Sequence, residues 1–141
     1  MEAQIFRPGR KIKGLIVIEM LTVLLVISVL ATIIVMDLRR AYYRGKLVGC
    51  VSNLRNLATA QNQFIVENRK YPDTLAELTP RYIASIPTCP SARADTYSTG
   101  YVRVEDPDRF TLHCKGTNHD DMRLGADEPW YNFDVGVGPH N

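Results

Sequence analysis

The sequence predicts an α+β protein in which one long N-terminal helix packs on a small antiparallel β-sheet. Three observations lead to this prediction: a 22-residue apolar run, an amphipathic pattern that follows it, and short alternating segments near the C-terminus. The chain has 141 residues, a length that suits one small globular unit with an appendage.

The apolar run extends from Leu15 to Met36 and contains a single charged residue, Glu19. A helix of this length would measure about 33 Å, which is enough to cross the hydrocarbon core of a bilayer. The run is longer than the apolar core of a secretory signal peptide, and no Ala-x-Ala cleavage site closes it. We therefore expect residues 15–36 to span a membrane once. Basic residues flank the run on both sides, so they do not set its orientation.

Beyond Met36, apolar residues recur every three or four positions, as in a helix with one buried face. They are Leu47, Val51, Leu54, Leu57, Ala58 and Phe64. The helix should end near Arg69, because Tyr71 precedes a proline and such a residue resists helical geometry. Residues 37–70 are thus predicted to be the amphipathic half of the helix, and residues 71–141 a globular head.

The head is predicted to contain one short helical turn and three strands. Thr74 and Glu77 have the spacing of a capping box, which opens a helix. Alternating apolar residues predict antiparallel strands at residues 97–104, 110–115 and 131–135. Phe110, Leu112 and Cys114 fall on one face of the second strand, which we expect to pack on the helix.

Glu19 is the most informative residue of the N-terminal segment Lys13-Gly14-Leu15-Ile16-Val17-Ile18-Glu19. A charge within an apolar run costs about 2.5–3.5 kcal/mol on insertion, and it therefore marks a functional site. A cut after Gly14 would release the amine of Leu15, a cation close to the Glu19 carboxylate. The two charges could neutralise each other within one subunit or between stacked subunits, where an unpaired charge is heavily penalised.

This segment resembles the class III signal of type IV prepilins and type II secretion pseudopilins, on Gly14, Glu19 and the run Ile18-Glu19-Met20-Leu21. The resemblance implies a pilin-like fold and a leader, residues 1–14, that prepilin peptidase removes by cutting between Gly14 and Leu15. It also implies N-methylation of Leu15 and a role for Glu19 in assembly. The protein would be a structural subunit of a type IV pilus-like or type II secretion pseudopilus filament.

The same resemblance implies partners and a location. The partners are other copies of the chain, other pilins or pseudopilins, prepilin peptidase, an assembly ATPase with its membrane platform, and membrane lipid. The protein would cross the inner (cytoplasmic) membrane once with its head outside the cytoplasm. The filament would lie in the periplasm or at the cell surface.

Other classes of protein make different predictions. A signal-anchored extracytoplasmic binding module that is not polymerised would use Trp130 and Tyr131, keep residues 1–14 and tolerate Glu19→Ala. An anchored enzyme would need an activity that is lost on changing His119 or Asp120. The sequence has no P-loop, nucleophile elbow or paired-His motif, so we expect no enzyme. The leader has a net charge of +3 and the whole chain has +2, so removal of the leader leaves a mature chain with a net charge near −1. The basic residues thus belong mainly to the leader, and nucleic-acid binding is not expected.

The three cysteines allow three pairings, and a head outside the cytoplasm permits a disulfide. We favour Cys89–Cys114, worth about 3 kcal/mol for a loop of that size. Cys50 would then be a buried thiol. A metal site built from Cys114, His113 and His119 lacks a fourth ligand and the usual spacing, so no metal ligand is predicted.

The order of residues from Tyr71-Pro72 to Ile86-Pro87, followed by a hairpin and a polar loop, also looks like the major pseudopilin of type II secretion. Those proteins bind calcium in a region comparable to the acidic loop here, and carboxylate oxygens suit calcium. The loop contains His119, Asp120, Asp121, Asp127, Glu128 and Asp134. The spacing assigns no ligands, so calcium stays an option and no other cofactor is expected.

Overall fold

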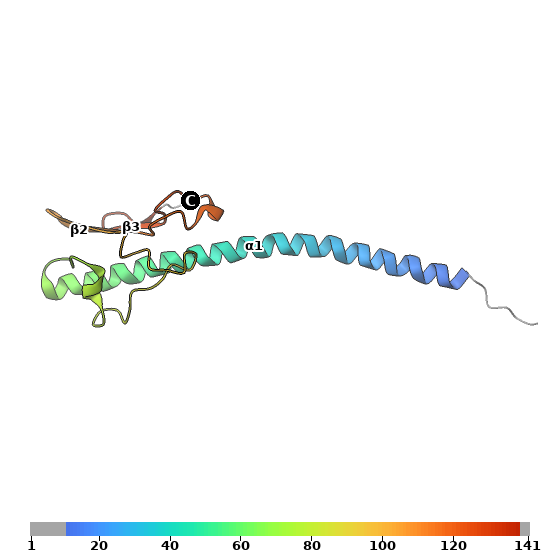
Figure 1. The fold of residues 1–141 in the computed structure, drawn as a ribbon, viewed down its shortest axis with the longest axis horizontal. Helices are drawn as coiled ribbons and strands as arrows, with labels where there is room; N and C mark the ends of the chain where they lie inside the picture. Colours follow the sequence, from blue (N-terminus) through green and yellow to red (C-terminus); the bar gives the residue numbers. More distant parts are fainter. Residues whose placement is uncertain (1–10, 139–141) are drawn as a thin grey trace, which may run out of the picture. The chain divides into compact units, whose positions relative to one another are not determined.

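The computed structural model describes residues 11–138. It contains two compact units, residues 1–40 and residues 41–141, called here the N-terminal and the C-terminal unit. Helix α1 (Lys11–Asn68) begins in the first unit and ends in the second, and all other elements belong to the C-terminal unit (Figure 1). The α+β prediction is confirmed. Residues 1–10 of the expected leader lie outside the described residues.

In the N-terminal unit, α1 contains the whole apolar run. Every side chain from Leu15 to Arg40 is exposed, and the helix is long and apolar enough to cross a membrane. The hydroxyls of Thr22, Ser28 and Thr32 donate hydrogen bonds of 2.7–2.8 Å to helix carbonyls three or four residues earlier. These hydroxyls are therefore satisfied within the helix itself.

In the C-terminal unit, one face of α1 is buried, as its periodicity predicts. Leu54, Leu57, Ala58 and Phe64 are buried and belong to the hydrophobic core. The helix ends at Asn68, close to the expected position. Arg69 adopts a left-handed conformation (φ 59°), and its N–H still bonds to a helix carbonyl, which closes the last turn.

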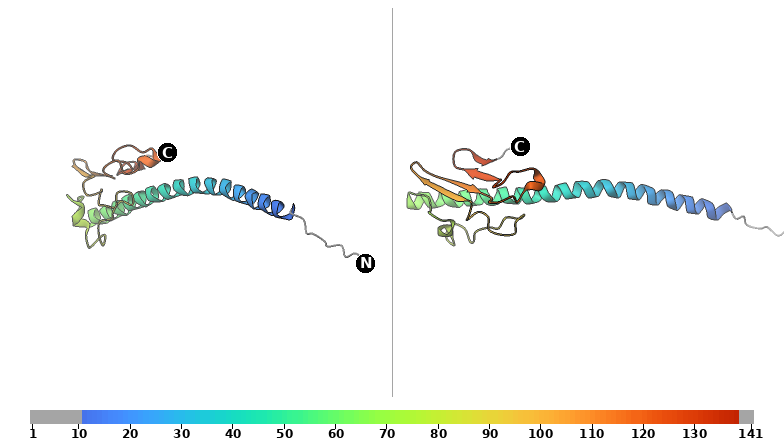
Figure 2. Two further views of the ribbon diagram at one scale, coloured as in Figure 1. Left: turned by 45° about the vertical axis from the view of Figure 1, so that its right-hand side comes forward. Right: turned by 45° about the horizontal axis from the view of Figure 1, so that its top comes forward.

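The sheet has four antiparallel strands in the order β1-β2-β3-β4, where three were predicted. Their bounds are β1 (Tyr101–Glu105), β2 (Asp108–His113), β3 (Trp130–Asn132) and β4 (Gly136–Gly138). In Figure 2 the strands, coloured orange to red, lie beside the green part of α1. The third strand is shorter than predicted and ends before Phe133, which is 46% exposed, and Val135, which is 65% exposed.

Strand β2 supplies the apolar face that covers α1. Phe110, Leu112 and Cys114 are all buried in the core, which confirms the predicted alternation. The Phe110 ring packs edge-on against Tyr71 at 4.8 Å between centroids and stacks on Tyr131 at 5.7 Å. The core therefore joins the helix, the segment after it and the centre of the sheet.

A short 3₁₀-helix, η1 (Leu75–Leu78), follows α1 where the capping box was predicted. Glu77 Oε1 accepts hydrogen bonds from the backbone N–H of Thr74 (2.9 Å) and Asp73 (3.0 Å). Leu75 and Leu78 are buried in the core. A second short 3₁₀-helix, η2 (Asp120–Met122), lies in the acidic loop before β3.

Asp108, the first residue of β2, links the hairpin to the end of the helix. Its Oδ2 accepts a hydrogen bond of 2.9 Å from the backbone N–H of Tyr71, and its Oδ1 accepts one of 2.9 Å from Arg103 Nε. Arg103 also forms an ion pair with Asp73. Burial acts to raise the pKa of Asp108, but the bonds from Arg103 and Tyr71 lower it below the usual range.

Candidate functional sites

Four side chains from three regions of the sequence converge inside the C-terminal unit. Cys50 is on α1, Cys89 is in the loop after η1, Cys114 directly follows β2, and His119 directly precedes η2. All four are buried, with exposed fractions of 0–2%. Their sulfur and nitrogen atoms all lie within 4.8 Å of one another, so they form one cluster, called here the thiol cluster.

Within the thiol cluster, Cys89, Cys114 and His119 lie at short and similar distances. The Sγ atoms of Cys89 and Cys114 are 3.5 Å apart. His119 Nε2 lies 3.6 Å from Cys89 Sγ and 3.7 Å from Cys114 Sγ. Cys50 Sγ lies within 4.8 Å of each of these three atoms.

The predicted disulfide between Cys89 and Cys114 is not formed in the structure, where all three cysteines are free thiols. Their sulfurs are in contact at 3.5 Å, well beyond the bond length of about 2.05 Å. The prediction brought together two cysteines that are indeed neighbours. It missed that Cys50 and His119 face the same point, so that Cys50 is part of the cluster and not an isolated buried thiol.

Of the three residues weighed as metal ligands from the sequence, Cys114 and His119 lie in the thiol cluster and His113 does not. His113 is the last residue of β2, and its Nδ1 lies 3.3 Å from the carbonyl oxygen of Asp127. It points away from Cys114 because successive side chains along a strand alternate between opposite faces. Cys50 and Cys89 complete the cluster instead.

Polar groups surround the four side chains and hold them in place. Tyr97 donates a hydrogen bond of 3.2 Å to Cys50 Sγ, and Asn118 Nδ2 donates one of 3.5 Å to Cys114 Sγ. Thr96 Oγ1 lies 3.3 Å from Cys114 Sγ. Ser91 Oγ lies 3.4 Å from Nδ1 of His119, the ring nitrogen that faces away from the sulfurs.

The cluster changes the acidity of its own members. Hydrogen bonds from Cys114 and Cys50 lower the pKa of the Cys89 thiol, whereas contacts with Cys114 and Cys89 raise the pKa of Cys50. Burial acts to lower the pKa of His119, but the contacts with Cys114 and Cys89 outweigh it and raise the pKa to about 9. These shifts favour a Cys89 thiolate beside a His119 imidazolium.

The acidic loop does not gather its carboxylates into a comparable group within residues 11–138. Asp127 accepts a hydrogen bond of 2.7 Å from the Gly116 N–H and forms an ion pair of 2.7 Å with Lys115. Glu128 accepts a hydrogen bond of 2.6 Å from the Gly125 N–H. These carboxylates are engaged by protein donors.

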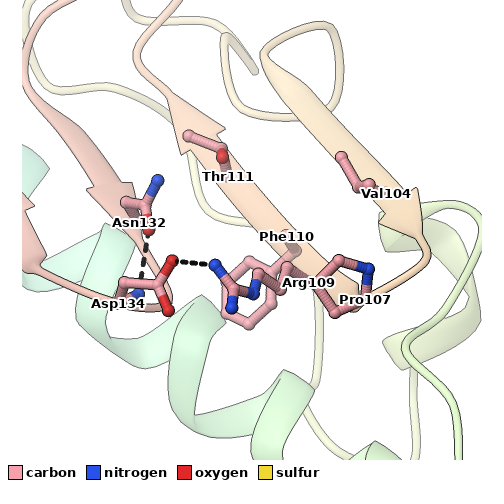
Figure 3. Close-up of a pocket in the computed structure, with 7 residues that line it drawn as sticks. All are labelled: Val104, Pro107, Arg109, Phe110, Thr111, Asn132 and Asp134. Carbon is pink, nitrogen blue, oxygen red and sulfur yellow. Dashed lines mark hydrogen bonds and ion pairs between the residues drawn. The ribbon is translucent and has the colours of Figure 1, made fainter.

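A shallow pocket of about 280 Å³ lies on the sheet near the β1–β2 turn (Figure 3). An ion pair of 2.6 Å joins two of its lining residues, Arg109 and Asp134, and Asn132 accepts a hydrogen bond from the Asp134 N–H. The seven lining residues include one hydroxyl, Thr111, and neither a histidine nor a cysteine. Its one carboxylate, Asp134, is engaged by Arg109.

The residues of the predicted processing site lie on α1. Gly14 and Leu15 are both within the helix, and Glu19 follows one turn later. Glu19 is exposed between Ile18, which is 62% exposed, and Met20, which is 63% exposed. The carboxylate therefore stands in a surface that is otherwise apolar.

Comparison of the chain with protein-family models, with curated proteins and with solved structures finds no match to any of them. The geometry of these sites is therefore the basis of the proposals that follow.

Proposed function

We propose that this chain is the precursor of a structural subunit of a type IV pilus-like or type II secretion pseudopilus filament. Prepilin peptidase removes the leader by cutting between Gly14 and Leu15, and the new N-terminus of Leu15 is methylated. The observation that carries the proposal is Glu19, the single charged residue in a 22-residue apolar run whose side chains are all exposed.

The exposed apolar side chains of the run must be shielded from water, and either lipid tails or neighbouring helices can do so. Lipid tails and the apolar side chains of neighbouring helices offer the same chemistry, so exchanging one for the other changes little free energy. A subunit can then be held in the membrane by this segment and later transfer the segment into a bundle of identical helices. Packing of this kind holds helices together without fixing how far one is shifted along another.

Glu19 supplies the missing information on axial position. Hydrolysis of the peptide bond after Gly14 would create an α-amino group on Leu15, which is protonated at neutral pH because its ordinary pKa is about 7.7–8.0. The two residues are four apart, which corresponds to about 6 Å along a helix. The same two charges can pair within one subunit or between neighbouring subunits, and only a register that pairs every carboxylate avoids a buried lone charge.

The proposal includes a location and partners. The protein is held in the inner (cytoplasmic) membrane by residues 15–36, with its head outside the cytoplasm. Its partners are membrane lipid, copies of itself, other pilins or pseudopilins, prepilin peptidase, and an assembly ATPase with its membrane platform. The filament lies in the periplasm or at the cell surface.

The first test is the N-terminus of the protein in membranes. The full chain is expressed with and without a prepilin peptidase, and its intact mass and N-terminal peptide are measured by mass spectrometry. We expect a chain that begins at Leu15, with a methylated amine, only when the peptidase is present. A chain that keeps residues 1–14 in the presence of the peptidase would contradict the proposal and favour a signal-anchored binding module.

The second test asks whether assembly requires the carboxylate of Glu19 in particular or any acid near the apolar run. Glu19→Ala should prevent assembly, whereas Asp37→Ala, which removes an acid just beyond the apolar run, should leave it intact. Assembly is measured by sedimentation and electron microscopy of sheared filaments, and folding by the fluorescence of Trp130, the single tryptophan. Normal filaments from the Glu19→Ala protein would refute the assigned role.

A further inference from the structure

We propose that Cys50, Cys89, Cys114 and His119 bind a structural zinc ion in the C-terminal unit. The four side chains are buried, and they converge from one helix and two separate loop segments of the chain. Their ligand atoms lie within 4.8 Å of one another, close enough to share one metal ion. The site is distinct from Glu19 and the processing site, and it does not depend on filament assembly.

The distances agree with a tetrahedral centre. With Zn–S bonds of about 2.3 Å and Zn–N bonds of about 2.0–2.1 Å, tetrahedral angles give S···S distances of about 3.8 Å and S···N distances of about 3.6 Å. The Sγ atoms of Cys89 and Cys114 are 3.5 Å apart, and His119 Nε2 lies 3.6 and 3.7 Å from them. A small shift of the side chains brings all of them to bonding distance of one ion.

The donor set selects the kind of metal. Thiolate sulfur with imidazole nitrogen suits zinc, copper(I) and iron, whereas calcium and magnesium require oxygen ligands. A cluster of several irons would need its cysteines to bind different iron atoms held apart by sulfide, and these four ligand atoms are too close together for that. Three thiolates and one imidazole complete a tetrahedron, which is the common arrangement of structural zinc.

A second layer of hydrogen bonds fits the same assignment. When Nε2 of a histidine binds a metal, its Nδ1–H needs an acceptor that fixes the ring, and Ser91 Oγ lies 3.4 Å from that nitrogen. Tyr97 and Asn118 donate to the sulfurs of Cys50 and Cys114, and such donors stabilise thiolate ligands.

Binding balances in charge and protons. A cluster of two thiols, one thiolate and one imidazolium holds three protons beyond those of three thiolates and a neutral imidazole, so binding of one Zn²⁺ releases three protons and leaves a centre with a net charge of −1. The metal is neither oxidised nor reduced, and no other reactant is needed. Because no open coordination position remains, the ion would hold the structure together and would carry out no reaction.

The site would tie together the least regular part of the unit. Between η1 and β1, and again between β2 and β3, the chain forms turns and loops with little secondary structure. Cys89 belongs to the first of these segments, His119 lies in the second, and Cys50 belongs to α1. Small domains with a limited core are often stabilised by a metal that cross-links distant segments in this way.

The test is the metal content of the full chain purified in detergent from cells grown with zinc, copper and iron present. We expect about one zinc per chain, as for a closed site with four protein ligands. His119→Ala should lower the zinc content severalfold, and His113→Ala, which changes a histidine outside the cluster, should leave it unchanged. Wild-type protein with no bound zinc, or with copper or iron in its place, would overturn the proposal.

Cobalt substitution provides a measurement on the wild-type protein, so its result does not depend on whether a variant folds. Replacing zinc with Co²⁺ should produce the visible d–d bands of a tetrahedral ion and thiolate-to-cobalt charge transfer. His119→Cys should bind zinc as four thiolates and rescue the loss seen with His119→Ala. An octahedral cobalt spectrum, or a Cys89–Cys114 disulfide in protein isolated with zinc, would refute the site.

Discussion

Removing the Asp108 carboxylate should detach the end of α1 from the β1–β2 hairpin. The carboxylate joins the backbone N–H of Tyr71 to the guanidinium of Arg103, each at 2.9 Å. In Asp108→Ala, the Tyr71 N–H loses its acceptor, and Arg103, whose side chain is 13% exposed, keeps only its pair with Asp73. One substitution therefore disturbs the helix end and the hairpin together.

The size of the effect follows from these two bonds. A hydrogen bond to a charged group contributes about 1.5–3 kcal/mol, and partial exposure of Asp108, whose side chain is 24% exposed, reduces this through solvent screening. We therefore expect Asp108→Ala to lower the free energy of unfolding by about 2–3 kcal/mol. For a unit of about 100 residues this corresponds to a fall in Tm of roughly 10–20 °C.

The contribution of Asp108 should also depend on pH. Its pKa is lowered in the folded protein, so the carboxylate stabilises the fold fully above its unfolded pKa of about 3.9. As the pH falls through the lower, folded pKa, this stabilisation is lost. The difference in stability between wild type and Asp108→Ala should therefore be largest at neutral pH and shrink in acid.

The assay is urea denaturation of the full chain in detergent, followed by the fluorescence of Trp130 on β3. Asp106→Ala is the matched control, because Asp106 lies in the same hairpin turn and pairs with no side chain or backbone donor among residues 11–138. The control should change stability by less than about 0.5 kcal/mol, as most surface substitutions do. An equally small effect of Asp108→Ala, or a difference that grows in acid, would refute the reasoning.

Two further predictions concern residues in the core. Gln61 is fully buried, and its Nε2 has no hydrogen-bond partner among the described residues. Gln61→Met should therefore increase the free energy of unfolding by about 1 kcal/mol and raise the urea midpoint. The Tyr101 hydroxyl, which donates to Gln61, keeps a second acceptor in a backbone carbonyl. A lower midpoint would contradict this. A Cβ at Gly100 would lie 2.2 Å from the carbonyl oxygen of His113, so Gly100→Ala should destabilise the protein by about 2 kcal/mol or more. Gly45→Ala, on an open helix surface, should instead stabilise the protein by up to about 1 kcal/mol in the same titration, and equal effects of the two substitutions would contradict the close contact.

Local signals in the sequence were enough to predict the helix and the hairpin. The helix follows from periodicity and from the proline after Tyr71, and the turn at Pro107 follows from turn residues between alternating segments. The predicted start of the first strand was wrong, because the Asp95 side chain accepts the backbone N–H of Tyr97 (2.9 Å) and Ser98 (3.0 Å). Such a side-chain turn competes with strand geometry.

The fourth strand and the thiol cluster depend on contacts between distant residues. Strand β4 is Gly-Val-Gly, which has low intrinsic strand propensity, and it forms because β3 offers an edge with which Val137 and its neighbours pair. Among the cluster ligands only Cys114 and His119 are close in sequence, whereas Cys50 and Cys89 stand 64 and 25 residues before Cys114, so no complete zinc motif is visible. The signals in the sequence were the pair Cys114 and His119 and the odd number of cysteines, which cannot all pair within a single chain.

The three hydroxyls of the apolar run, on Thr22, Ser28 and Thr32, turn back onto their own helix. Their protons are therefore used within the helix, and these hydroxyls have no donor left for a neighbouring chain. Where such helices pack together, these three side chains donate no bond that would fix rotation or sliding, so Glu19 is the one charged group of the run that can set the register.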